Sequence, residues 1–142
     1  MKKSIVISFV FLFLFVSVIG CTDLGSEVKV TVDSKRYSDS IGTDWSEQDA
    51  SDGYTFFIVK ITVENVGDER VHTNPIYTTI STTDGQTYDY SGSSFVFTDH
   101  FDAVDVQPGN KQTGTLAYEI PKSATPDKFF YNDFTNDIEI DL

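Results

Sequence analysis

The chain has 142 residues, a length suited to one domain, and a formal net charge of −12 at pH 7. Its only cysteine excludes internal disulfides, a zinc ribbon and a thioredoxin-like motif. Its only methionine is the initiator, so a blue-copper site lacks its ligands. The negative charge would repel a phosphate backbone, and we expect no nucleic-acid partner.

Residues 1–20 have the order of a secretory signal peptide: two lysines precede an apolar run over residues 5–19, and a glycine comes directly before Cys21. A cysteine at that point resembles the lipobox of prokaryotic lipoproteins. In that family the cysteine carries a thioether-linked diacylglyceryl group and becomes the first residue after cleavage. The resemblance implies lipidation of Cys21, although Val18 stands where the lipobox usually has leucine.

Two alternatives remain open for this segment. It could be an uncleaved membrane anchor, although the apolar run is shorter than the ~20 residues of a spanning helix. It could also be an ordinary signal peptide followed by a free thiol. We divide the chain into a signal peptide at 1–20, a lipidated cysteine and tether at 21–27, and one domain at 28–142. The predicted location is the extracytoplasmic face of the cell membrane, where a two-chain lipid gives stable attachment.

The domain opens with valines at alternate positions over residues 28–32, which predicts a half-buried strand. Residues 34–53 are polar and rich in aspartate, serine and glycine, and we expect a long loop there. Trp45 lies in this loop, close to Asp44 and Glu47. We expect its indole to fold back and cap the core. The alternative is that these three residues form a binding loop.

Residues 54–64 form the clearest predicted strand. Phe57 and Val59 point to one face, while Phe56 and Ile58 on the opposite face are also apolar. Such a strand is central in its sheet or covered at one end. Asp84-Gly85 predicts a hairpin turn. Further strand segments are expected around residues 76–82, 88–90, 95–97, 104–106, 115–120, 129–131 and 138–142. With no helical periodicity, this pattern predicts an antiparallel sandwich or barrel.

Several motifs together resemble a known family: Tyr54–Asn65 followed by Gly67-Asp68, Asp84–Tyr88, Val106–Gly109 and Gly114–Pro121. The family consists of extracellular domains of unknown function carried by prokaryotic lipoproteins and related to a mycobacterial immunoprotective antigen. The resemblance implies a telokin-like, immunoglobulin-like β-sandwich, and the expected fold class is therefore all-β and antiparallel. It implies no catalytic residues, because the family has no established ones to carry over.

The densest set of candidate metal ligands is Asp99, His100 and Asp102, with Asp105 nearby. Carboxylates with an imidazole suit a divalent cation such as calcium, but the spacing is not that of a calcium-binding loop. We expect a solvated acidic connection here, with a metal site as the alternative. The two histidines, His72 and His100, lack the context of a catalytic triad.

Aromatic residues gather in one stretch of the sequence, where core packing is expected and a sugar- or peptide-binding face is the alternative. They are Tyr77, Tyr88, Tyr90, Phe95 and Phe97. Taken together, the sequence predicts a lipid-anchored extracytoplasmic binding module that is not an enzyme and needs no cofactor. Its partner is expected to be another envelope or extracellular protein. The alternative is a divalent-cation or small-ligand binding protein acting as a sensor or scavenger.

Overall fold

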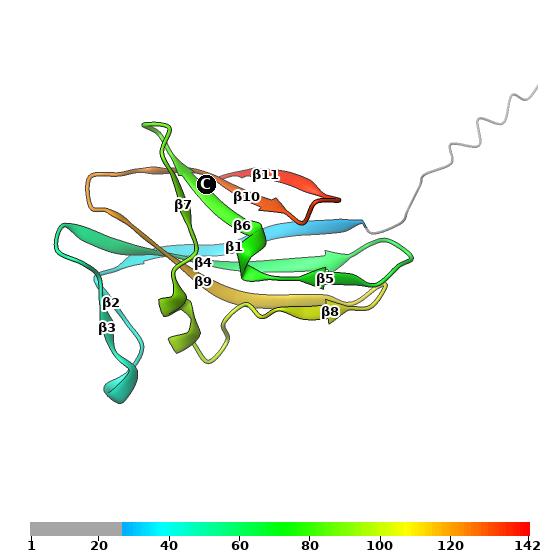
Figure 1. Cartoon of the computed structure of the whole chain (residues 1–142), viewed down its shortest axis with the longest axis horizontal. Helices are drawn as coiled ribbons and strands as arrows, with labels where there is room; N and C mark the ends of the chain where they lie inside the picture. Colours follow the sequence, from blue (N-terminus) through cyan, green and yellow to red (C-terminus); the bar gives the residue numbers. More distant parts are fainter. Residues whose placement is uncertain (1–26) are drawn as a thin grey trace, which may run out of the picture.

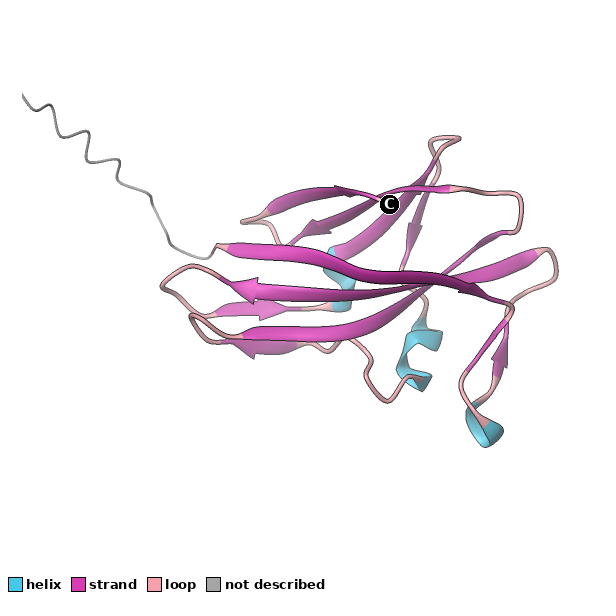
Figure 2. Ribbon diagram, turned by 180° about the vertical axis from the view of Figure 1, so that it is seen from behind, coloured by secondary structure: helices cyan, strands magenta, loops and turns pink. Residues whose placement is uncertain are grey.

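Two antiparallel sheets pack face to face in the computed structural model, which describes residues 27–142 (Figures 1 and 2). The predicted all-β antiparallel sandwich is therefore confirmed. The signal peptide and Cys21 lie outside the described residues. Within residues 27–142, no helix has the length and apolar character needed to cross a bilayer.

The first sheet has three strands in the order β1 (Val28–Ser38), β4 (Tyr54–Asn65) and β9 (Lys111–Pro121). The second has four, in the order β11 (Asp137–Asp141), β10 (Pro126–Asn132), β6 (Thr78–Thr82) and β7 (Thr87–Asp89). Two short ladders complete the fold: β2 (Ser40–Ile41) with β3 (Gln48–Asp49), and β5 (Val71–Thr73) with β8 (Val104–Val106). Single 3-10 turns, η1 (Asp44–Ser46), η2 (Pro75–Tyr77) and η3 (Gly92–Val96), lie in the connections.

The main core lies between the two sheets. Alternate residues of β4 and β9 face inward and meet aromatic and aliphatic residues of β6 and β10. The largest fully buried side chains of this core are Tyr118, Tyr131, Phe57, Phe101, Phe129, Ile61, Ile80, Leu116 and Ile120. Tyr77, Tyr88 and Tyr90 are partly buried against the same core, which confirms the expected core packing for these three, although only Tyr88 lies on a strand.

The outer face of the first sheet carries a second, smaller core. Phe56 and Ile58 of β4 pack there with Ala117 of β9 and Ile41 of β2. Phe97 packs against them, but the expected strand around residues 95–97 is instead the end of η3 and its cap. β4 is thus central in its sheet and covered on both faces at its start, which confirms the prediction for this strand.

The expected loop over residues 34–53 is wrong. β1 continues to Ser38, and its second half pairs with β4 from Ser34 opposite Lys60 to Ser38 opposite Phe56. A register irregularity at Asp33 separates the two halves of β1. Residues 34–37 are exposed on both faces because β1 lies at the border of its sheet. The alternation that reveals a half-buried strand is therefore missing from this part of the sequence.

The two borders of the first sheet differ. The outer border of β9 is covered by residues 91–101, because the Thr115 N–H donates to the Asp99 carbonyl at 2.7 Å and the Phe101 N–H donates to the Thr115 carbonyl at 3.0 Å. Gly114 allows this close approach, since a Cβ there would lie 2.5 Å from the Phe101 Cα. Over residues 29–37 of β1, in contrast, the described backbone hydrogen bonds run only to β4.

Candidate functional site

A two-stranded arm projects from one end of the sandwich (Figures 1 and 2). It consists of β2, β3 and the tip between them, residues 42–47. At its base, Ile41 is buried in the smaller core and the Ala50 N–H donates to the Asp39 carbonyl at 2.9 Å. The arm is therefore anchored at its base, and only its tip stands free of the body.

The tip is held by a tight turn. Gly42 has φ = 93°, and a Cβ there would lie 2.4 Å from the Ser46 carbonyl oxygen. Asp44 also adopts a positive φ of 46°, an uncommon conformation for a residue with a side chain. The Ser46 N–H donates to the Thr43 carbonyl at 3.0 Å, and the Ser46 hydroxyl donates to the same oxygen at 3.0 Å. The turn thus fixes the backbone on both sides of Trp45.

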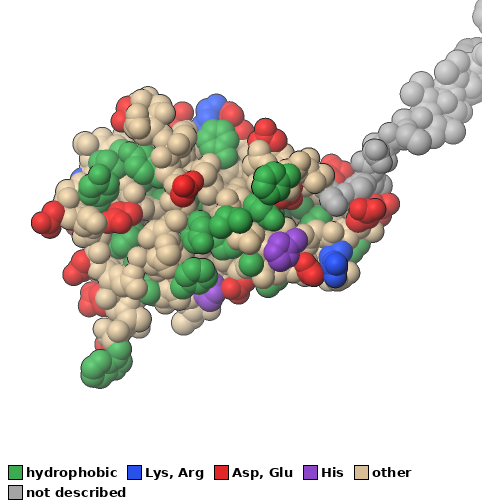
Figure 3. Space-filling view, in the orientation of Figure 1, with side chains coloured by type: hydrophobic (Ala, Val, Ile, Leu, Met, Phe, Trp, Pro, Cys, Tyr) green, Lys and Arg blue, Asp and Glu red, His purple; other side chains and the backbone are tan. Residues whose placement is uncertain are grey.

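Trp45 is fully exposed at this tip, with a relative accessibility of 104%. The expectation that its indole caps the core is wrong, because η1 turns the side chain away and Ile41 fills the nearby core position instead. The arm protrudes from the body in Figure 3, and apolar surface is visible at its end. The structure therefore leaves the Trp45 side chain in solvent at the end of the arm.

The acidic residues near Trp45 are exposed as well. Asp44 and Glu47 lie on the same tip, and Asp49 follows on β3. None of them forms an ion pair within the described residues. The three residues suggested by the sequence as a binding loop are thus brought together, and their charges are free to meet a partner.

The acidic connection behaves differently, because its carboxylates turn to separate partners, lysine in one case and histidine in the others. Asp99 pairs with Lys60 at 3.0 Å, and Asp102 pairs with the Nε2 of His100 at 2.6 Å. Asp105 contacts the Nδ1 of His72 at 2.9 Å. Hydrogen bonding to Lys60 lowers the pKa of Asp99, and hydrogen bonding to His72 lowers the pKa of Asp105.

The candidate metal ligands consequently do not converge. His100 has both ring nitrogens engaged, since its Nδ1 lies 2.9 Å from the Phe97 carbonyl oxygen while its Nε2 faces Asp102. Within residues 27–142, no group of three or more histidine, cysteine, aspartate or glutamate side chains is arranged to hold a metal ion. The alternative of a metal site at Asp99, His100, Asp102 and Asp105 gains no support from this geometry.

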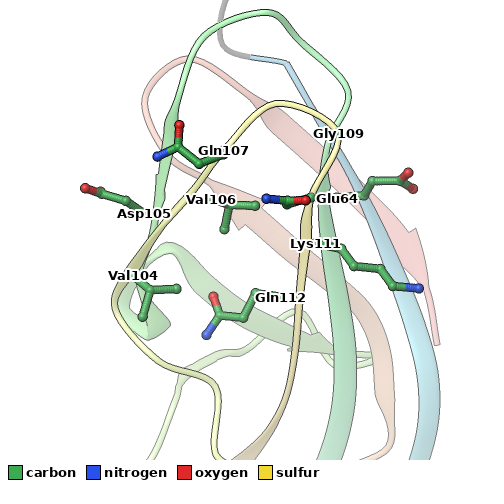
Figure 4. Close-up of a pocket in the computed structure, with 9 residues that line it drawn as sticks. Glu64, Val104, Asp105, Val106, Gln107, Gly109, Lys111 and Gln112 are labelled. Atoms are coloured by element: carbon green, nitrogen blue, oxygen red, sulfur yellow. The ribbon is translucent and has the colours of Figure 1, made fainter.

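A surface hollow of about 690 Å³ lies beneath the turn between β8 and β9 (Figure 4). Asp105 extends to one side of this turn, while Glu64 and Lys111 extend to the other. Gln107 and Gln112 supply amides rather than titratable groups. The charged side chains around the hollow therefore diverge, and they form no acid–base pair directed into it.

One exposed aromatic residue has no counterpart among the sequence candidates. Phe134, in the turn between β10 and β11, is 92% exposed and has φ = 71°. Its ring packs edge-on against Tyr77 with centroids 6.0 Å apart. The Val28 N–H donates to Asn136 in the same turn, so Phe134 lies at the end of the sandwich where β1 begins. The turn residues flanking Phe134 in the sequence could have indicated this loop.

The fold and the projecting arm define a small β-sandwich domain with an aromatic residue displayed at one end. The chain belongs to the family described as a domain of unknown function (DUF4352), whose model matches residues 22–140. The match extends well beyond the strands and turns that carry the resemblance in the sequence. YxkC of Bacillus subtilis (strain 168), an uncharacterized protein, is 29% identical over 133 residues, which cover 87% of this chain and 73% of YxkC.

Solved structures share the fold at low identity. The secreted protein MPT63 of Mycobacterium tuberculosis superposes with a TM-score of 0.61 at 15% identity, over 81% of this chain and 82% of MPT63. The yjhA protein of Bacillus subtilis gives 0.61 at 20% identity, over 82% and 92%. A candidate lipoprotein of Bacillus subtilis, ycdA, gives 0.62 at 14% identity, over 82% of this chain and 37% of ycdA. These similarities support the assignment of the fold and do not indicate an activity.

Proposed function

We propose that this chain is a non-catalytic binding module, held by a diacylglyceryl group on Cys21 at the extracytoplasmic face of the membrane, which recognises another envelope or extracellular protein through its arm. The exposure of Trp45 on a fixed turn is the observation that carries this proposal. Tryptophan is enriched among the few residues that supply most of the binding energy of protein interfaces.

The anchoring part of the proposal draws on the sequence before β1 and on the relatives. Fold relatives include a protein described as secreted and a candidate lipoprotein, both of which suit an extracytoplasmic location. Residues 22–27 separate Cys21 from β1 and span at most about 20 Å. β1 begins at the end of the sandwich opposite the arm (Figure 1). A lipid on Cys21 would therefore direct the arm away from the bilayer.

The proposed recognition of a partner by the arm is supported by the free energy gained when the indole is buried. Burying an indole removes about 200 Å² of surface from water, and at about 25 cal/mol per Å² this is worth about 5 kcal/mol before the costs of association. Because Trp45 is fully exposed, the whole of that gain is available on binding. The hydrogen-bonded turn around Thr43 and Ser46 lowers the entropy lost when the tip is immobilised.

The charges around the tip indicate the kind of surface that would receive it. Asp44, Glu47 and Asp49 surround an apolar centre with unpaired carboxylates. A complementary surface has an apolar slot for the indole with lysine or arginine at its rim, where a cation could also stack on the indole. A folded protein offers both features at fixed positions, and we therefore propose a protein partner for the arm.

The proposal is tested by crosslinking in the cell. A photoreactive tryptophan analogue, which keeps the indole, is placed at position 45 in one version of the full chain and at position 134 in another, because Phe134 is a similarly exposed aromatic at the other end of the sandwich. We expect one discrete partner, in near-stoichiometric amount, from position 45 alone. A Cys21→Ser version run alongside separates anchoring from recognition.

Two results would contradict this proposal. One is equal capture of the same protein from positions 45 and 134, and the other is recovery of bulk envelope proteins only. As a further check, Trp45→Ala combined with a photoreactive residue at position 47 should lose the partner, because the new crosslinker lies on the same tip but the indole is missing. Undiminished capture by this version would show that the indole is not the recognition element.

A further inference from the structure

The uncovered border of β1 is a second feature with the properties of a binding site. The other border of the same sheet is covered by residues 91–101, and the border strands of the second sheet are short or strongly acidic: β7 has three residues, and β11 exposes Asp137, Glu139 and Asp141. β1 has eleven residues and backbone partners on one side only over residues 29–37. An open strand border of this kind can accept an additional strand.

The register irregularity at Asp33 limits where such a strand could pair. It breaks the ladder between Val32 and Ser34, so that the regular border after it runs from Ser34 to Ser38. Five residues are a typical length for one strand. The candidate docking segment is therefore residues 34–38, and we call it the β1 border.

Unpaired positive charge gathers at this strand. Lys60, Arg70, Lys122 and Lys128 form ion pairs with acidic residues. The remaining basic residues after residue 26, namely Lys29, Lys35, Arg36 and Lys111, form none within the described part of the chain, and three of these four lie on β1. Although the protein is acidic as a whole, these free cations would attract the carboxylates of a ligand at short range, where solvent screens the more distant negative charges.

A groove of about 370 Å³ opens beside the β1 border and reaches the core. Tyr37 and Lys35 lie opposite Phe57 and Val59 in the β1–β4 ladder, and these two β4 residues belong to the core between the sheets. Tyr37 stays 56% exposed on that face, with its ring tilted against Phe57 at 5.1 Å. The groove is closed on its other side by Thr125, Pro126 and Leu142.

Together, the charges and the groove indicate which kind of ligand would fit the β1 border. In an added strand, successive side chains would point alternately into the groove and away from it. Side chains entering the groove would meet Tyr37 and Phe57, and carboxylates at the intervening positions would meet Arg36, which lies on the opposite face of β1 from Lys35 and Tyr37. The matching ligand is an extended segment in which acidic and apolar residues alternate.

We propose that the β1 border binds an extended acidic peptide segment of a partner, which adds as a strand to the β1–β4–β9 sheet. This site is separate from the arm. It uses backbone pairing and positive charge, whereas the arm offers an indole among negative charges. The two proposals can therefore fail independently of each other.

The test uses the whole chain in detergent micelles and a short capped peptide of alternating glutamate and isoleucine, with binding followed by calorimetry. We expect saturable binding that Arg36→Glu weakens about tenfold or more. The matched control is Lys111→Glu, which makes the same charge change at an unpaired lysine on β9 and should stay within about twofold of the unmodified chain. Trp45→Ala should bind like the unmodified chain.

A second peptide tests the contribution of backbone pairing separately from the contribution of charge. The same peptide with alternate backbone amides N-methylated keeps its side chains but cannot pair along one border. We expect it to lose binding, and a lysine–isoleucine peptide should not bind at all. Three results would each overturn the proposal: no saturable binding of the glutamate peptide, equal weakening by Arg36→Glu and Lys111→Glu, or undiminished binding of the N-methylated peptide. Loss of peptide binding in Trp45→Ala would mean that the peptide binds at the arm and not at the β1 border.

Discussion

The hydroxyl of Tyr118 donates a hydrogen bond to the Thr78 Oγ1 at 2.7 Å, and this bond joins β9 of one sheet to β6 of the other through the middle of the sandwich. Both side chains are completely buried. The Thr78 hydroxyl donates in turn to the Pro75 carbonyl at 2.7 Å, so that the pair is satisfied without water. Burial raises the pKa of Tyr118 well above its usual range, and the hydroxyl stays protonated as the donor.

Tyr118→Phe should destabilise the domain. The substitution leaves the Thr78 Oγ1 without its donor inside the core, and the free energy of unfolding should fall by about 1–2 kcal/mol. Urea unfolding measures this as a lower midpoint with an unchanged slope. An unchanged midpoint would mean that the bond between the sheets contributes nothing net.

Tyr131→Phe, in contrast to Tyr118→Phe, should leave the stability of the domain unchanged or raise it. The Tyr131 hydroxyl is buried without a hydrogen-bond partner in the described part of the chain, and burial raises its pKa above the usual range. Removing an unsatisfied hydroxyl relieves its desolvation cost while the ring stays packed. We expect stability to be unchanged or higher by about 1 kcal/mol in the same urea experiment. A loss as large as that of Tyr118→Phe would reveal a partner for this hydroxyl.

Acid should weaken the fold through the pairing of Asp99. The Lys60 ammonium and, to a smaller degree, the Thr115 hydroxyl hold the pKa of Asp99 below its ordinary value of 3.8. The unfolded state then binds the proton first, so this contribution is fully present above about pH 4 and is lost as the pH falls through the folded pKa. Asp99→Asn should therefore lose less stability than the unmodified chain between about pH 5 and about pH 2.

The matched control for the acid experiment is Asp44→Asn, because Asp44 has no ion-pair partner within the described residues and asparagine accepts a positive φ. Unfolding by urea at a series of pH values supplies the measurement. If Asp99→Asn and Asp44→Asn change the pH dependence to the same extent, the Lys60 pair is not its source.

The sequence predicts those strands and turns that are indicated directly by residue types or by the positions of apolar side chains. β4 is recognisable because its apolar residues face two cores, and the Asp84-Gly85 turn between β6 and β7 is recognisable because Gly85 supplies the positive φ that the turn needs. The second half of β1 is not recognisable. It pairs through its backbone, and both of its faces meet water over residues 34–37.

The candidate site, too, can be predicted from the sequence only in part. The sequence brings Trp45, Asp44 and Glu47 together as near neighbours, but the direction of the indole depends on the backbone conformation at Gly42 and Asp44. Neighbouring carboxylates of the acidic connection diverge because their partners, Lys60, Arg70 and His72, come from distant strands and turns. Spacing along the chain does not reveal such partners, and so the sequence alone does not predict that these carboxylates turn apart.

Gly42→Ala should disturb the arm selectively. A methyl group at this position would meet both the positive φ and the Ser46 carbonyl oxygen 2.4 Å away, so that the tip must rearrange. Gly53→Ala is the matched control, because Gly53 has a similar φ of 83° but no atom within 4 Å of an added Cβ. We expect both variants to lose about 1 kcal/mol of stability from the φ strain, as measured by urea unfolding.

Only Gly42→Ala should also lose the partner captured from position 45. Equal capture by the two glycine variants would mean that the conformation of the tip does not matter for recognition.

The two strands of the arm are held together by a ladder of only two residue pairs, Ser40 with Asp49 and Ile41 with Gln48. Of these four residues, only Ile41 is buried, and residues 43–47 are all partly or fully exposed. Substitutions at exposed tip positions that do not hold the turn should therefore leave the sandwich unchanged. This separation makes the tip a natural position for grafting a different sequence onto an unchanged scaffold.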